Sequence, residues 1–145
     1  MKISTGLRNH LLATGSLKAG LDGGVIRIYS GAEPAAADDS IGAAVLLCTI
    51  SLNDGGTGIT LDSTPSGGVI QKNPSETWSG TPVATGTGAF WRFSGTADAG
   101  GSSTTEKRAQ GTIGTALADM IVASTTFTSG VLRQIDNAAF GLPAS

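Results

Sequence analysis

The regular spacing of turn-forming residues is the feature that most constrains how this chain can fold. Glycine occupies 22 of the 145 positions, and glycine, proline, asparagine and aspartate recur between short apolar segments. Glycine, asparagine and aspartate accept positive φ angles at low steric cost, and proline removes a backbone donor, so such clusters favour turns. Turn signals at intervals of roughly 8–12 residues are typical of all-β sandwiches, jelly rolls and barrels. The spacing therefore predicts an all-β protein.

The segments between these turns are rich in the β-branched and aromatic residues that favour strands. Residues 25–29 read Val-Ile-Arg-Ile-Tyr, and residues 44–52 form a nearly continuous apolar run. The turn signal at 53–58 follows that run and predicts a hairpin with a strand at 59–61. The other predicted strands are 69–72, 75–79, 84–94, 108–113, 120–122 and 125–128, with weak alternation over 131–140.

Only the N-terminal part of the chain has a helical pattern. Leu7, Leu11 and Leu12 recur at helical spacing, so one apolar face of this helix must be covered. The face either covers an open edge of the chain's own sheet or docks on a neighbouring molecule. We therefore expect an N-terminal helical segment, residues 1–23, followed by an antiparallel β-sandwich of jelly-roll type, residues 24–145.

The charge of the chain argues against nucleic acids and membranes as partners. The net charge is −2, and lysine and arginine are scattered, whereas a nucleic-acid-binding face needs a concentrated basic stripe. No apolar run approaches the roughly 18 residues of a membrane span, and the N-terminus lacks a signal-peptide pattern. Charged residues make up 14%, against about 25% in a typical domain, which suits a surface covered by neighbours. We expect a protein made in the cytoplasm.

The residue types that a reactive centre needs are sparse. The sequence has one histidine, His10, and one cysteine, Cys48, whereas a zinc site takes three or four ligands. The glycine-rich stretches 55–58 and 86–88 lack the lysine of a phosphate-binding loop. We predict Cys48 to be a buried apolar side chain and His10 to be solvated or capping. We predict no catalytic residue, no metal, no cofactor and no small-molecule substrate.

The carboxylates are the remaining candidates for chemistry. A glycosidase-like acid pair needs two of them, and a calcium site could use Asp38, Asp39 and a second loop, although EF-hand spacing is absent. Most of the acids neighbour glycine, proline or serine, where aspartate commonly bonds to nearby backbone, so we interpret them as turn formers. They are Glu33, Asp38, Asp39, Asp54, Asp62, Glu76, Asp98, Glu106, Asp119 and Asp136.

Aromatic and arginine residues on the predicted strands are candidates for binding. Trp78 and Trp91 could stack on a sugar, which leaves a carbohydrate-binding module open as an alternative. Trp91 and Phe93 share one face of their strand while Arg92 lies on the other, and alternating aromatics more often build a core. Arg27 and Arg92 lie mid-strand, so they either pair with carboxylates across the sheet or point at a partner.

Several short phrases, spread over most of the chain, carry a family resemblance. They include Leu-Arg-Asn-His-Leu-Leu at 7–12 and Phe-Trp-Arg-Phe at 90–93, together with residues 15–18, 23–31, 34–37, 46–47, 49–52, 72–74 and 78–80. In these phrases the chain resembles the small virion structural proteins of tailed bacteriophages. The resemblance is one of texture and includes no catalytic motif. It implies membership of the virus particle.

Two positions in the particle are compatible with this resemblance. One is that of a capsid decoration or cement protein, which binds the outer surface of the major capsid shell and stabilises it; such proteins are often small β-rich dimers or trimers. The other is a neck or tail component. The neutral composition and single compact domain favour decoration. The implied partners are further copies of the chain and the phage major capsid protein, and the implied location is the capsid surface.

We expect the contacts with these partners to lie mainly outside the strands. The predicted contact surfaces are residues 1–21, 31–40 and 95–105, the last of them as a mobile or partner-facing loop. The candidate interface residues are Leu7, Leu11, Arg27, Arg92, Glu33, Asp38 and Asp39.

Overall fold

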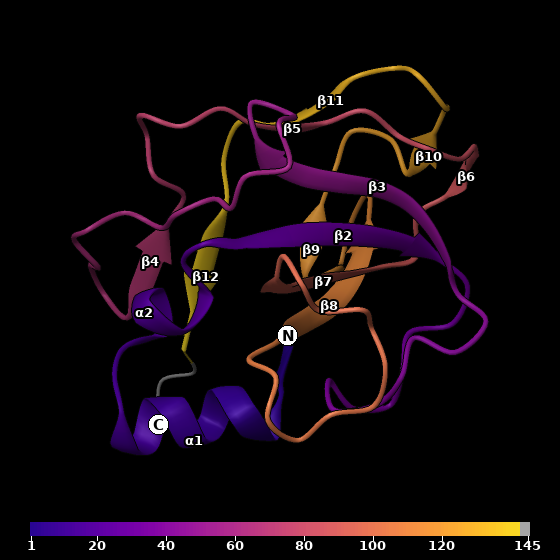
Figure 1. Ribbon diagram of the computed structural model, residues 1–145. Helices are drawn as coiled ribbons and strands as arrows, with labels where there is room; N and C mark the ends of the chain where they lie inside the picture. The colour runs from indigo at the N-terminus through magenta and orange to yellow at the C-terminus, as the bar shows by residue number, and fades with distance from the viewer. Residues whose placement is uncertain (143–145) are drawn as a thin grey trace.

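The computed structural model describes residues 1–142 and is built around one curved, mainly antiparallel sheet (Figure 1). Its strands follow the order β1-β8-β7-β2-β3-β5-β11, and β9 pairs in parallel with β8. The strands of this sheet are β1 (Lys2–Ile3), β2 (Gly24–Ser30), β3 (Val45–Leu52), β5 (Trp78–Gly80), β7 (Phe90–Gly95), β8 (Ala109–Gly114), β9 (Met120–Ile121) and β11 (Arg133–Ile135).

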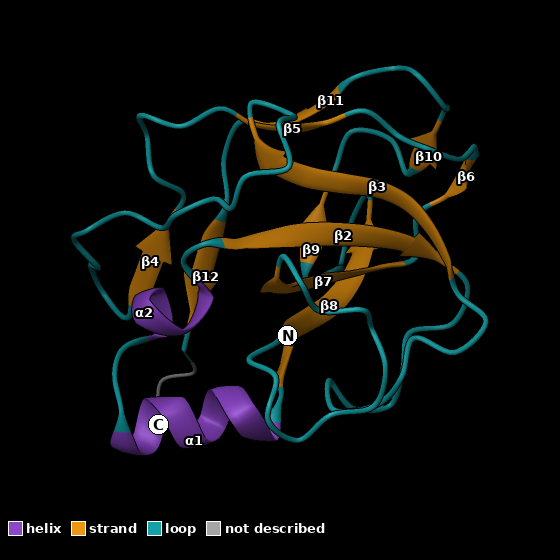
Figure 2. Ribbon diagram, in the orientation of Figure 1, coloured by secondary structure: helices purple, strands orange, loops and turns teal. Residues whose placement is uncertain are grey.

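Two short ribbons and two helices complete the fold within residues 1–142 (Figure 2). One ribbon pairs β4 (Val69–Gln71) with β12 (Ala139–Gly141), and the other pairs β6 (Gly86–Thr87) with β10 (Thr126–Phe127). The helices are α1 (Thr5–Ala13) and α2 (Leu17–Leu21). The β4–β12 ribbon and α2 lie at the same end of the molecule, above α1 in Figure 1. The chain is thus mostly β, with antiparallel sheets and short helices, as the sequence predicts.

The core lies between one face of the main sheet and the β4–β12 ribbon. Ile26 and Ile28 of β2 pair with Phe93 and Trp91 of β7, and all four side chains are buried. Phe140 of β12 packs on both rings, with centroids 6.1 Å from Trp91 and 5.8 Å from Phe93. The alternation predicted for this strand is therefore confirmed, since Trp91 and Phe93 belong to the core cluster.

The opposite face of the sheet, called here the polar face, carries buried polar side chains beside the stacked rings of Tyr29 and Phe90, and it is covered by two loops. Arg92 of β7 pairs in register with Gln110 of β8, and both are fully or almost fully buried. The loops at residues 31–44 and 96–108 cover this face. They are attached to it by hydrogen bonds from the guanidinium groups of Arg92 and Arg108 to their backbone carbonyls. The sheet therefore buries an apolar face and a polar face.

The turn predicted after β3 forms, but the strand expected beyond it does not. Asn53 and Asp54 both adopt positive φ angles, of 52° and 57°, as turn-forming residues do. The chain then crosses to the start of β2, where Ile59 forms an isolated bridge with Gly24. Strand β5 takes the place beside β3 that the hairpin prediction assigned to residues 59–61. These residues form only isolated bridges.

The N-terminal residues are part of this architecture. Strand β1 pairs with β8 at one edge of the sheet. The hydroxyl of Ser4 caps α1 by accepting from the Leu7 N–H, and it also donates to the carbonyl of Glu106. Leu7 is 0% exposed, so α1 buries an apolar residue against its own domain. Helix α1 therefore covers its own domain, which is the first of the two alternatives given for its apolar face.

None of the helices within residues 1–142 is long and apolar enough to cross a membrane.

Candidate functional site

The structure brings the predicted polar interface residues to the buried polar face of the sheet and its covering loops. Arg92 is 1% exposed, and its Nε donates to Oε1 of Gln110 at 2.9 Å. Its Nη2 also donates to the carbonyl of Asp39, at 3.0 Å. The amide of Gln110 donates to the carbonyl of Pro34 at 3.0 Å and to the carboxylate of Glu33 at 3.3 Å. Residues 33–39 are thereby fastened to the sheet.

A buried ion pair fastens the second loop. Nε and Nη2 of Arg108 donate to Oδ2 and Oδ1 of Asp98, each at 2.7 Å. Arg108 also donates to the carbonyls of Ala37 and Gly101, so one guanidinium joins both loops. Burial alone would raise the pKa of Asp98, but hydrogen bonds from Arg108 and from the Gly100 N–H outweigh it, and the net shift is downward.

Arg92 carries a positive charge that no carboxylate contacts directly within the described chain. Burial lowers the pKa of Arg92, and the neighbouring charge of Arg108 lowers it further. Its Nη1 has no hydrogen-bond partner among residues 1–142. Arg92 was expected either to pair with a carboxylate across the sheet or to point at a partner; its cross-strand partner is instead the amide of Gln110.

Two of the predicted interface residues are inaccessible to a partner. Leu7 and Arg92 are 0% and 1% exposed, because the chain's own helix and loops cover them. Leu11 is half-buried against the core cluster. Arg27 is also half-buried, and its guanidinium donates to the Ser94 hydroxyl and to the carbonyls at 95 and 96. Asp39 is the one member of the predicted set with an exposed side chain.

The loop at 95–105, predicted to be mobile or partner-facing, is bonded along its length to the rest of the chain. The N–H of Ile41 donates to the carbonyl of Gly100 at 2.9 Å, and the N–H of Ser103 donates to the carbonyl of Asp38 at 2.8 Å. Together with the ion pair of Arg108, these bonds give the loop a fixed position. The mobile alternative is therefore wrong, and the partner-facing alternative stays a prediction. Ile41 and Asp38 lie far from this loop in the sequence, whereas Arg108 is ten residues from Asp98.

Four carboxylates in the described part of the chain share one structural role. Each bonds to the backbone N–H and the hydroxyl of a single threonine and so clamps two segments together. The pairs are Asp38 with Thr5, Asp54 with Thr81, Glu76 with Thr60, and Asp119 with Thr112. The first three pairs are 33, 27 and 16 residues apart. These acids were predicted to be turn formers; Asp38 and Asp54 do lie in turns, but the carboxylates of all four also clamp a threonine in another segment.

The hydrogen bonds of the clamps, and for Asp119 the N-terminal ammonium group, lower the pKa values of these four carboxyls. The pKa of each clamp carboxyl is below its ordinary value; the hydroxyl of the clamped threonine is the largest cause for Asp38 and Asp54, and the N-terminal ammonium group is the largest for Asp119. For Glu76, burial raises the pKa but hydrogen bonds from Thr60 and Trp78 outweigh it. Residues 1–142 contain no group of three or more potential metal-ligating side chains.

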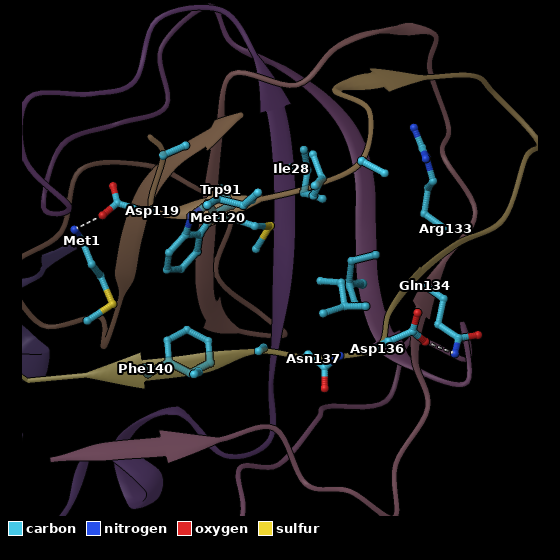
Figure 3. Close-up of a pocket in the computed structure, with 18 of the residues that line it drawn as sticks. Met1, Ile28, Trp91, Asp119, Met120, Arg133, Gln134, Asp136, Asn137 and Phe140 are labelled. Carbon is cyan, nitrogen blue, oxygen red and sulfur yellow. Dashed lines mark hydrogen bonds and ion pairs between the residues drawn. The ribbon is translucent and has the colours of Figure 1, made fainter. Parts of the chain in front are cut away.

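A cleft opens on the apolar side of the sheet (Figure 3). Its volume is about 810 Å³. Ile28, Ile50 and Trp91 contribute from the main sheet, while the walls come from residues 118–124 and 133–141. Phe140 stands beside Trp91 in the cleft (Figure 3). The lining is apolar enough to receive a hydrophobic side chain.

Charges mark the two ends of this cleft. The N-terminal ammonium group of Met1 pairs with Asp119 at one end (Figure 3). Arg133 and Asp136 stand at the other end, where Gln134 donates to Asp136 at 2.7 Å. The guanidinium of Arg133 lies 4.9 Å from the centre of the Phe127 ring. The cleft therefore has both apolar and polar side chains in its lining and one charge of each sign at either end.

The tryptophans do not form a platform for sugars. Trp78 is 0% exposed and donates its Nε1–H to Glu76 at 2.8 Å. Trp91 is 2% exposed, and its Nε1 lacks a hydrogen-bond partner in the described part of the chain. Stacking on a sugar needs an accessible ring face, and neither ring provides one in this structure.

The single cysteine and histidine are both packed inside the fold. Cys48 is 0% exposed, as predicted, and burial raises its pKa to about 12. His10 is half-buried, and it lies so close to Gly20 that an added Cβ there would be 3.0 Å from its ring. His10 therefore spaces α1 from α2, which differs from the solvated or capping role predicted for it.

Comparison with protein-family models, with curated proteins and with solved structures gives no match to this chain.

Proposed function

We propose that this chain is a structural protein of a tailed-phage virion that decorates the outer surface of the major capsid shell. The observation that carries the proposal is the apolar surface left uncovered by a chain with only 14% charged residues. Large apolar side chains that are at least 41% exposed in the described part of the chain are Met1, Leu12, Val45, Val83, Leu117, Ile121, Val131, Leu132 and Leu142. Exposed apolar surface of this kind is typical of proteins that act in contact with others.

Part of this surface forms one patch, the apolar loop patch, made of Val83, Val131 and Leu132. The three side chains are 69%, 55% and 56% exposed. The two loops that carry them are joined, because the N–H of Gly130 donates to the carbonyl of Pro82 at 3.0 Å. They belong to the end of the molecule where β6 and β10 pair (Figure 1). This patch is our candidate for the contact with the shell.

The fastened loops suit a protein that stabilises a shell mechanically. The ion pair of Asp98 with Arg108 holds one covering loop in position before any partner binds. The bonds of Arg92 and Gln110 to the carbonyls of Asp39 and Pro34 hold the other. A preformed surface loses little conformational entropy on binding. A protein that binds only the assembled shell stabilises that shell by mass action, and many weak copies act together. Chemistry is not needed for this role, and the clamp carboxylates are already committed to the fold.

Within this proposal the fold is a jelly-roll-like sandwich, with the β4–β12 ribbon as its second layer. A neck or tail component of the same virion is the second candidate, because it would need the same kind of apolar contact surface. The carbohydrate-binding alternative loses its support, since Trp78 and Trp91 are both buried.

Binding to purified shells tests the proposal. Heads from the source phage, stripped of this chain, are mixed with the purified protein, and occupancy is measured by sedimentation. We expect Val83→Asp with Leu132→Asp to lower shell affinity at least tenfold, because two charges enter the apolar contact. The matched control is Thr57→Asp, an exposed change in the turn after β3. Equal occupancy for all three proteins, or none for the wild type, would refute decoration through this patch.

A further inference from the structure

We propose that two copies of this chain associate about a twofold axis, with Leu117 of each copy inserted into the cleft of the other. The inference goes beyond the proposed function because it assigns a self-association surface. It also does not depend on the virion: the cleft and Leu117 belong to a different part of the chain from the apolar loop patch.

Leu117 is placed unfavourably in two respects within the isolated chain. Its side chain is fully exposed, with a relative exposure of 104%. Its backbone has a φ of 52°, in the left-handed region that disfavours leucine because of its Cβ. In the described chain, the other residues with positive φ are glycines and the turn residues Asn53 and Asp54. An apolar side chain held in solvent on an unfavourable backbone points to a functional contact.

The loop that carries Leu117 is held rigidly in this conformation. Asp119 accepts hydrogen bonds from the N–H and hydroxyl of Thr112, and its own N–H donates back to that hydroxyl at 3.1 Å. The ammonium group of Met1 adds an ion pair to the same carboxylate. Leu117 is therefore presented as a preorganised knob, which lowers the entropic cost of binding.

The cleft lies directly beside this knob. Ala118 and Asp119, the two residues that follow Leu117, form part of the cleft wall. The cleft offers partly exposed apolar side chains that include Met120, Val122 and Ile135, and its volume of about 810 Å³ exceeds that of one leucine side chain. A protein that carries a knob next to a matching hollow can pair with its own copy so that both knobs are buried.

The charges at the cleft ends are complementary in a twofold, antiparallel arrangement. Asp119 and the Met1 ammonium group mark the end nearest Leu117, and Arg133 and Asp136 mark the far end (Figure 3). When two copies face each other in opposite directions, Arg133 approaches the partner's Asp119, and Asp136 approaches the partner's Met1 ammonium group. The same operation carries Leu117 to the far end of the partner's cleft. Each charge thus meets the opposite sign, which favours this register.

The oligomeric state of purified protein tests the inference. In sedimentation equilibrium over a range of concentrations, we expect the wild type to populate a dimer. Leu117→Gly should weaken the dimer at least tenfold while leaving the monomer fold intact, because glycine suits the positive φ. The matched control is Leu12→Ala, because Leu12 is an exposed leucine of α1 that does not line the cleft. It should dimerise as the wild type does.

A disulfide experiment tests the direction of the pairing. Leu117 immediately precedes Ala118 and Asp119 at one end of the cleft, and Gln134 lies at the other end (Figure 3). We therefore expect cysteines at these positions to join across the proposed interface and not within one copy. Leu117→Cys combined with Gln134→Cys should give a covalent dimer on mild oxidation, and Leu117→Cys alone should give little. Cys48 does not interfere, because it is buried.

Each part of the inference has its own contradicting result. A wild type that stays monomeric at every concentration, a trimer or higher oligomer, or a dimer unaffected by Leu117→Gly would each overturn the inference. Equal cross-linking of the single and double cysteine variants would overturn the twofold register. A wild type that is monomeric and still binds phage heads would refute the dimer interface but not the proposal of capsid decoration. A wild type that dimerises but does not bind phage heads would refute decoration but not the dimer interface.

Discussion

Arg108 and Asp98 form an ion pair through two parallel hydrogen bonds, with side chains only 1% and 3% exposed. Ten residues separate them in the sequence, and the whole loop between them closes over the polar face of the sheet. The same guanidinium reaches the carbonyl of Ala37 in the other covering loop. This pair therefore decides whether the two loops form one surface.

Removing one partner of this pair should destabilise the protein strongly. Asp98→Asn leaves the guanidinium of Arg108 buried without its counter-charge, and such changes cost about 3–5 kcal/mol. The free energy of unfolding from urea denaturation measures the effect. Arg8→Ala is the control, because Arg8 is exposed and bonds only to the Thr5 hydroxyl, so we expect a loss within about 0.5 kcal/mol. A similar small loss for Asp98→Asn would contradict the structural role of the pair.

The clamp carboxylates predict a loss of stability in acid. Their pKa values are lowered on folding, so the folded state holds fewer protons than the unfolded chain near pH 4. Their contribution is complete above the ordinary values of 3.8 for aspartate and 4.5 for glutamate, and it is lost as the pH falls through the lower folded-state values. The melting temperature should be flat from pH 6 to 8 and should fall below about pH 4. An unchanged melting temperature at pH 3 would exclude this linkage.

The clamp between Glu76 and Thr60 can be tested on its own. Thr60→Val keeps the shape of the side chain but removes the hydroxyl that Glu76 binds at 2.6 Å and that Asn73 bonds at 3.0 Å. We expect a loss of about 1–3 kcal/mol, as for hydrogen bonds to charged groups. Thr60→Ser retains the hydroxyl and should recover most of that loss in the same denaturation assay. Equal stability of the valine and serine variants would show that the clamp contributes nothing.

A glycine at the crossing of two segments fixes the path of the chain after β3. An added Cβ on Gly58 would lie 2.1 Å from the carbonyl oxygen of Gly23, which is backbone and cannot move aside. Gly58→Ala should therefore cost about 1–3 kcal/mol of unfolding free energy by overpacking. Gly95→Ala, where nothing lies within 4 Å of the added atom, should change it by less than about 0.5 kcal/mol. The reverse ranking would show that the crossing is not tight.

The thiol of Cys48 should be inert until the protein unfolds. Burial raises its pKa to about 12, so the reactive thiolate is scarce at neutral pH and the sulfur is shielded as well. An aromatic disulfide reagent should release one equivalent of chromophore only in denaturant. Rapid labelling of the native protein, with an unchanged circular dichroism spectrum, would show that the thiol is accessible.

Local sequence patterns predicted a large part of the fold correctly. The aromatic alternation over 90–93 correctly placed Trp91 in the core and Arg92 on the opposite face, because the period of a strand is a property of neighbouring residues. The predicted strand at 25–29 lies within β2, whose flanking glycines bound it. Strands of two or three residues, such as β9 and β11, are too short to show a period, which is why the cleft they line could not be foreseen.

The contacts that organise the polar face left no local trace in the sequence. Asp98 lies in a stretch of glycine, alanine, serine and threonine that suggests a mobile loop, yet hydrogen bonds from Arg108 and from the Gly100 N–H fix it. Asp38 looks like a turn former, yet its threonine is 33 residues away. The mid-strand position of Arg92 did indicate that its side chain has a specific polar partner. The sequence could not show whether that partner is another molecule or Gln110 on the next strand.

The copy number of this chain in purified particles of its source phage tests the central claim most directly. Quantitative mass spectrometry, calibrated against the major capsid protein, gives that number. A decoration protein should be present in hundreds of copies, in fixed proportion to the shell. About a dozen copies would instead indicate the neck or tail, and absence from the particles would contradict the assignment to the virion.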